Sequence, residues 1–89
     1  MPYIEKKRRE HFKQDEITAF VDGTTDIFTV GDINYIITNV VNQYVKLKGL
    51  SYSSINDVIG ILECAKMEFY RRVAVPYEEK KKELNGDVY

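Results

Sequence analysis

TVGDINYIITNVVNQYVKLKGL, residues 29–50, is the stretch that decides the fold. Thr29 can cap a helix, and Asp32 stands three residues later, which is a weak form of the capping box. Gly49 followed by Leu50 is typical of a helix C-cap. Between these signals, apolar residues recur every three or four positions, as one face of a helix requires. They are Ile33, Ile36, Ile37, Val40, Val41, Tyr44 and Leu47. The pattern predicts a helix over residues 32–48.

A second apolar stripe follows a short loop and predicts a helix over about residues 54–75. Ser51 and Ser54 are candidate caps, and Ser54 with Asp57 has the spacing of a capping box. The stripe consists of Ile55, Val58, Ile59, Leu62, Ala65, Phe69 and Val73. Gly60 lies in its middle, where a glycine indicates close helix packing. The short loop predicts that the two helices form an antiparallel hairpin.

Pro76 interrupts the second helix. A proline has no backbone N–H to donate, and its ring disfavours helical angles at the preceding residue, Val75. A kink or a restart of the helix is therefore expected at Pro76. Residues 77–84 resume a helical composition, and the Asn-Gly pair at 85–86 ends it.

The first third of the chain has a weaker pattern. Residues 1–16 form a charged arm with few apolar anchors, which indicates a solvated helix or a partly flexible segment. Residues 17–30 fit helical spacing, although the segments 17–21 and 27–30 on either side of an Asp-Gly pair also fit a β-hairpin. The helix is the preferred interpretation. The sequence thus predicts an all-α fold in one domain, residues 1–89, with N-terminal helical segments joined to the hairpin.

The composition excludes several classes of protein. Thirteen basic and fourteen acidic residues give a formal net charge of −1, so a nucleic acid is not an expected partner. No apolar run approaches 18 residues and no signal peptide is recognisable, which predicts a cytoplasmic protein without a membrane partner. Cys64 and His11 are the only cysteine and histidine, so one chain forms neither a disulfide nor a Cys/His metal site. Because a chain this short buries only about 60–65% of its unfolded surface, homo-oligomerisation is the expected source of further stability.

Catalytic signatures are missing from the sequence. Nucleophilic catalysis requires a base beside the nucleophile, but His11 lies in the charged arm and Cys64 lies near the buried edge of a predicted helix. The five glycines have neither dinucleotide-binding nor phosphate-loop spacing. We therefore expect a protein that is not an enzyme, needs no cofactor and works by binding a partner.

The polar side of the predicted helix 32–48 carries no formal charge between Asp32 and Lys46. Amides form hydrogen bonds without the desolvation cost of a buried ion, so they suit a face that another subunit or a ligand covers. Plain exposure to solvent is the third interpretation. The uncharged polar residues are Asn34, Thr38, Asn39, Asn42 and Gln43.

A basic and aromatic segment surrounds Pro76. Arginine forks bind phosphate or carboxylate groups, and tyrosine rings stack on bases. The alternative interpretation is a solvated helix edge on which Tyr70 and Tyr77, seven residues apart, pack against a neighbour. A further basic run, residues 6–9, is either a soluble arm or an anion contact near a subunit junction. The predicted ligand-binding residues are Asn34, Lys66, Tyr70, Arg71, Arg72 and Tyr77.

Residues 31–89 resemble a group of small, uncharacterised proteins encoded by tailed bacteriophages. The segments that carry the resemblance are GDINYIIT (31–38), INDVIG (55–60), LECAK (62–66), FYRRV (69–73), PYE (76–78) and the ending NGDVY (85–89), together with the opening MPYI (1–4). The resemblance implies a phage accessory protein in the cytoplasm of the infected host. By analogy of size and helical character, such proteins include oligomeric sponges that sequester cyclic-nucleotide messengers of bacterial defence systems.

Two functions are expected as alternatives. In the first, a homo-oligomer sequesters a small anionic, nucleotide-like molecule without altering it. The two arginines would contact phosphate or carboxylate, the two tyrosines would stack, and Asn34 and Lys66 would add polar contacts. In the second, an oligomeric protein-binding module engages and inhibits a host or phage protein, with the arginines at the rim of the interface.

Overall fold

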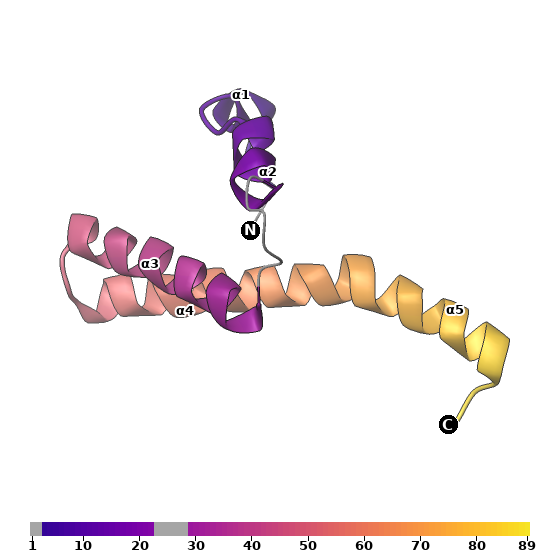
Figure 1. Cartoon of the computed structure of the whole chain (residues 1–89). Helices are drawn as coiled ribbons and strands as arrows, with labels where there is room; N and C mark the ends of the chain where they lie inside the picture. Colours follow the sequence, from indigo (N-terminus) through magenta and orange to yellow (C-terminus); the bar gives the residue numbers. More distant parts are fainter. Residues whose placement is uncertain (1–2, 23–28) are drawn as a thin grey trace. The chain divides into compact units, whose positions relative to one another are not determined.

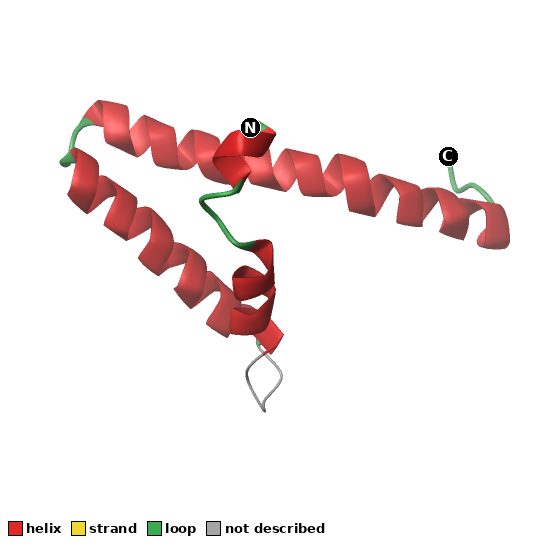
Figure 2. Cartoon of the chain, turned by 90° about the horizontal axis from the view of Figure 1, so that it is seen from above, coloured by secondary structure: helices red, strands yellow, loops and turns green. Residues whose placement is uncertain are grey.

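A computed structural model describes residues 3–22 and 29–89. All regular elements of these residues are helical, which confirms the predicted all-α class (Figures 1 and 2). In chain order they are α1 (Lys6–Arg9), α2 (Gln14–Asp22), α3 (Val30–Lys48), α4 (Tyr52–Phe69), the π-helical turn η1 (Tyr70–Ala74) and α5 (Val75–Asn85). The chain divides into two units, residues 3–58 and residues 59–89, with the boundary inside α4. None of the helices in the described ranges combines the length and the apolar character that crossing a membrane requires.

Two short helices, α1 and α2, lie in the described residues 3–22. In α1, the Arg9 Nε donates a hydrogen bond to the carbonyl of Ile4 at 2.9 Å. The first turn of α2 carries two carboxylates, which complement the positive end of the helix dipole. The helical interpretation is confirmed over residues 17–22, where the alternative β-hairpin is wrong. Residues 23–28 lie outside the described residues, so the prediction for that part stays a prediction.

Thr29 and Asp32 form a complete capping box at the start of α3. The Asp32 N–H donates to the Thr29 hydroxyl at 3.1 Å, and the Thr29 N–H donates to the Asp32 carboxylate at 3.0 Å. The helix therefore begins at Val30, two residues before the predicted start, and it ends at the predicted residue. Gly49 follows with a φ of 88°, and its N–H donates to the carbonyl of Val45 at 2.8 Å.

A second capping box begins α4. The Ser54 N–H donates to the Ser51 hydroxyl at 3.1 Å, and the Ser51 N–H donates to the Ser54 hydroxyl oxygen at 3.0 Å. The Ser54 hydroxyl also donates to the carbonyl of Gly49 at 2.8 Å, and Ser54 is buried. Consequently α4 begins at Tyr52, earlier than predicted, and Ser54 occupies the third helical position and not the cap.

One side-chain hydrogen bond joins α3 to the first turns of α4. The Tyr44 hydroxyl donates to an Asp57 carboxylate oxygen at 2.9 Å. This hydrogen bond raises the pKa of Tyr44 above 10.0, because the carboxylate accepts a proton that only the neutral phenol offers. The contact stabilises the fold below pH 10.0 and is lost as the pH rises past the raised pKa. The antiparallel arrangement of the two helices stays a prediction.

The described residues bury no apolar side chain. On α3, Val40 remains 65% exposed and Leu47 remains 77% exposed, while Phe69 at the end of α4 is 64% exposed. A Cβ atom added to Gly60 would meet no atom within 4 Å. Since Gly60 and α3 belong to different units, the close helix packing expected at Gly60 stays a prediction. Burial of apolar surface normally offsets the entropy cost of folding. These helices instead leave a large apolar surface uncovered.

The helical path continues through Pro76 by way of the π turn. The Val75 N–H donates to the carbonyl of Tyr70, five residues back, and Val75 keeps helical angles, with φ −62° and ψ −50°. The prediction that Pro76 removes Val75 from the helical region is wrong. The i→i+5 turn changes the hydrogen-bond register before the proline, which relieves the α-helical conflict between a proline ring and the carbonyl four residues back. The predicted restart agrees with the first residue of α5 to within one position.

Candidate functional site

A hollow of about 460 Å³ lies at the end of α4 and in the π turn. Its lining residues are Lys66, Met67, Glu68, Tyr70 and Arg71. The structure therefore brings together three of the six predicted ligand-binding residues, namely Lys66, Tyr70 and Arg71. The volume falls in the range of small-molecule sites. Two cations and one aromatic ring around such a hollow suit a ligand with an acidic and a planar part.

Both cations of the hollow are paired with carboxylates. The Arg71 Nη2 lies 2.9 and 3.2 Å from the two carboxylate oxygens of Glu68, whose side chain is only 18% exposed. The Lys66 Nζ lies 3.1 Å from the Glu63 carboxylate. The sequence interpretation missed both acidic partners, although Glu-x-x-Lys and Glu-x-x-Arg are spacings at which helical side chains meet. An anion that enters the hollow would compete with these carboxylates for the two cations. Each surface ion pair contributes only about 0–1 kcal/mol to stability.

Arg72 and Tyr77 do not line this hollow. The i→i+5 turn between Tyr70 and Tyr77 holds one more residue than an α-helical turn, so it rotates the following residues by roughly 100°. Two tyrosines seven residues apart consequently lose the common face that an α-helix would give them. The Tyr77 ring instead contacts the Lys81 ammonium, which lies 5.6 Å from the ring centroid. Among the described residues, no carboxylate forms an ion pair with Arg72.

Asn34, the sixth predicted residue, belongs to the other unit and is exposed in the first turns of α3. Its uncharged neighbours Thr38, Asn42 and Gln43 are exposed as well. Asn39 Nδ2 donates to a backbone carbonyl of its own helix at 2.8 Å. The expectation that Asn34 joins the arginines in one site stays a prediction.

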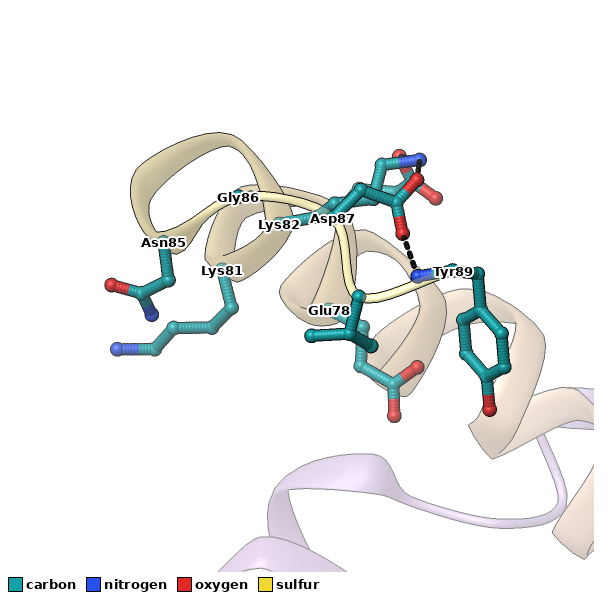
Figure 3. Close-up of a pocket in the computed structure, with 9 residues that line it drawn as sticks. Glu78, Lys81, Lys82, Asn85, Gly86, Asp87 and Tyr89 are labelled. Carbon is teal, nitrogen blue, oxygen red and sulfur yellow. Dashed lines mark hydrogen bonds and ion pairs between the residues drawn. The ribbon is translucent and has the colours of Figure 1, made fainter.

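A second hollow, of about 580 Å³, lies at the end of α5, and the sequence pattern does not predict it (Figure 3). Gly86 has a φ of 88° and turns the chain after α5. Asp87 then lies 3.8 Å from the Lys82 ammonium, and its carboxylate accepts a hydrogen bond from the Tyr89 N–H at 2.9 Å. Lys82 also lies 3.6 Å from Glu79. Because charges of both signs line this hollow, its electrostatics favour neither an anion nor a cation.

The other reactive side chains are placed as follows. Cys64 is a half-buried free thiol on α4, and His11 is exposed after α1. Within residues 3–22 and 29–89, no three His, Cys, Asp or Glu residues gather in a way that could hold a metal ion. The arrangement at the end of α4 can hold a ligand by charge and ring contacts.

Comparison with known proteins gives one kind of match. No curated protein and no solved structure matches the chain significantly. A family model described as a domain of unknown function, DUF6899, matches residues 1–88. That description names neither an activity nor a source, so a phage origin stays a proposal. Since the match spans nearly the whole sequence, the chain belongs to the DUF6899 family.

Proposed function

We propose that this chain is a non-catalytic, self-associating protein that binds and sequesters a small anionic, nucleotide-like molecule. The observation that carries the proposal is the hollow where Lys66, Tyr70 and Arg71 meet. Guanidinium and ammonium groups bind phosphate, and a tyrosine ring offers a stacking surface to a base. The resemblance to phage proteins supports an accessory role of the anti-defence type in the cytoplasm of an infected host.

Arg72 does not line the hollow but is a further cation of the same π turn. The Lys66–Glu63 and Arg71–Glu68 pairs leave the hollow close to neutral. Arg72 follows Arg71 directly in the π turn, and no described carboxylate neutralises it. A phosphate group bound near the rim of the hollow would thus gain one uncompensated guanidinium.

Self-association is supported by the uncovered apolar surface. Because the described residues bury no apolar side chain, they lack the main contribution that offsets the conformational entropy lost on folding. A second copy of the chain can cover this apolar surface, because identical chains are present together and commonly form symmetric homo-oligomers. The self-association is therefore part of the proposed function, and the ligand site would be held by an assembly.

Isothermal titration of the full chain tests the ligand proposal. The panel consists of cyclic dinucleotides, cyclic trinucleotides, linear mononucleotides and cyclised ADP-ribose products. We expect saturable binding of at least one of them, and recovery of the same molecule unchanged after the complex is denatured. Absence of heat with every member of the panel contradicts the ligand class. Recovery of a chemically altered molecule contradicts the non-catalytic role.

The exposed apolar side chains favour a second candidate function, a protein-binding module that inhibits a host or phage protein. Phe69 is an aromatic residue, a type enriched at protein interfaces, and Val40 and Leu47 add exposed apolar surface that a partner can cover. Affinity capture from infected cells separates the candidates. A sponge recovers only further copies of itself, whereas a protein-binding module recovers a second polypeptide in a fixed ratio.

A further inference from the structure

One exposed line of side chains along α3 has opposite charges at its two ends. Asp32, Asn39 and Lys46 are spaced by seven residues, which is about two turns, so they lie along one side of the helix. Tyr35, Asn42 and Gln43 flank Asn39 on the same side, and all six residues are exposed. We call these six residues the α3 face. The helix dipole accounts for an acid near the start and a base near the end, but it does not account for the uncharged centre.

We infer that a second copy of this chain docks antiparallel on the α3 face, about a two-fold axis at Asn39. This inference rests on the self-association proposed above and adds to the covered apolar surface a polar face on which two copies meet. Asp32 and Lys46 lie equally far from Asn39, so the antiparallel arrangement places Asp32 of each copy opposite Lys46 of the other. A parallel arrangement in register would instead place like charges together, which costs several kcal/mol at an interface.

The chemistry at the axis is self-complementary. A residue on a two-fold axis meets its own copy, and an amide both donates and accepts hydrogen bonds. Asn39 can therefore pair with Asn39 of the second copy, whereas a lysine or glutamate at that position would repel itself. By the same symmetry, Tyr35 lies opposite Gln43 of the second copy, and an aromatic ring can pack on an amide stem without leaving a charge buried.

The charged groups at the two ends of the α3 face can each form a further ion pair. Lys46 forms no ion pair with any described carboxylate, while Asp32 uses its Oδ2 to accept the Thr29 N–H. A hollow of about 310 Å³ lies beside Lys46 and is bounded by Asn42, Val45, Gly49 and Leu50. In the antiparallel arrangement, the first turns of the second copy's α3 lie over this hollow and bring Asp32 to it.

Charge reversal at one end of the face tests the docking. Lys46→Glu places a second carboxylate opposite Asp32 at each end of the pair, and Lys48→Glu is the control with the same charge change two residues along the helix. We expect Lys46→Glu to raise the dissociation constant of the self-association at least about tenfold, measured by light scattering across a dilution series, and Lys48→Glu to leave it within about threefold. Equal dissociation constants for the two variants would overturn the inference. Circular dichroism at high concentration checks that both variants remain helical.

Cysteine cross-linking keeps the inference testable even if charge reversal unfolds the chain. In a Cys64→Ser background, Asn39→Cys brings two thiols together at the axis, whereas Asn34→Cys lies on another side of α3. Mild oxidation is expected to link Asn39→Cys chains into dimers and to leave Asn34→Cys chains unlinked. An oligomer in which Asn39→Cys does not cross-link contradicts this interface alone. A monomeric wild-type chain contradicts both the interface and the self-association on which it rests.

Discussion

Replacement of Gly49 by alanine is expected to lower the free energy of unfolding by about 1–3 kcal/mol. Gly49 joins α3 to the Ser51–Ser54 capping box with a φ of 88° and a ψ of 142°, a backbone conformation that side chains oppose. Nothing lies within 4 Å of an added Cβ, so the expected loss comes from backbone strain and not from a clash. Urea denaturation followed by circular dichroism, at one fixed chain concentration, measures it.

Gly60→Ala is the matched control, because the same atom is added to the same type of residue. Gly60 has helical angles and open space around its Cβ position, so alanine there is expected to raise the free energy of unfolding by about 0.5–1 kcal/mol. The two glycines thus predict effects of opposite sign. A neutral Gly49→Ala would contradict the positive φ at the turn. A loss of stability in Gly60→Ala would show that another copy packs on that side of α4.

The double variant Arg71→Gln with Arg72→Gln is expected to weaken binding of the nucleotide found by titration at least about 100-fold. Hydrogen bonds to charged groups contribute about 1.5–3 kcal/mol each, so the loss of two guanidinium contacts supports this magnitude. Removing Arg71 also removes the Nη2 contacts to the two carboxylate oxygens of Glu68, a residue that lines the hollow. Titration calorimetry of wild type and variant with the same nucleotide gives the ratio.

A second double variant controls for net charge. Lys48→Gln with Lys80→Gln also removes two positive charges, but at positions outside the hollow. The affinity of this variant for the nucleotide is expected to stay within about threefold of wild type. Equal losses in both double variants would mean that the anion responds to overall charge and not to the arginines. Unchanged binding in the arginine variant would contradict the proposed site.

Much of α3 and the start of α4 is predictable from the sequence, because local contacts determine both. The capping box of Thr29 with Asp32 and the positive φ of Gly49 involve residues within a few positions of each other. The two-residue error at each helix start has a local cause as well. A capping box extends the helix to the residue after its cap, as the Ser51–Ser54 box does for α4.

The candidate site is less predictable, because it depends on a hydrogen-bond register. Pro76 indicates an interruption, but the pattern does not distinguish a kink from a turn with one extra residue. Tyr70 and Tyr77, seven residues apart, consequently do not line the same hollow. Lys66 and Arg71 do, because most of the π turn lies after them. The hollow at the end of α5 depends on the direction of the chain after Gly86, for which the sequence offers only an Asn-Gly pair followed by an acid.

We propose that this chain keeps its helices by covering its exposed apolar surface with further copies of itself. Multi-angle light scattering after size-exclusion chromatography, combined with circular dichroism over a dilution series, tests it most directly. We predict a mass at least twice the 10.4 kDa of one chain, and a helix content that falls together with the mass on dilution. A 10.4 kDa monomer that keeps its helix content and melts cooperatively at the same temperature at every concentration would contradict the claim.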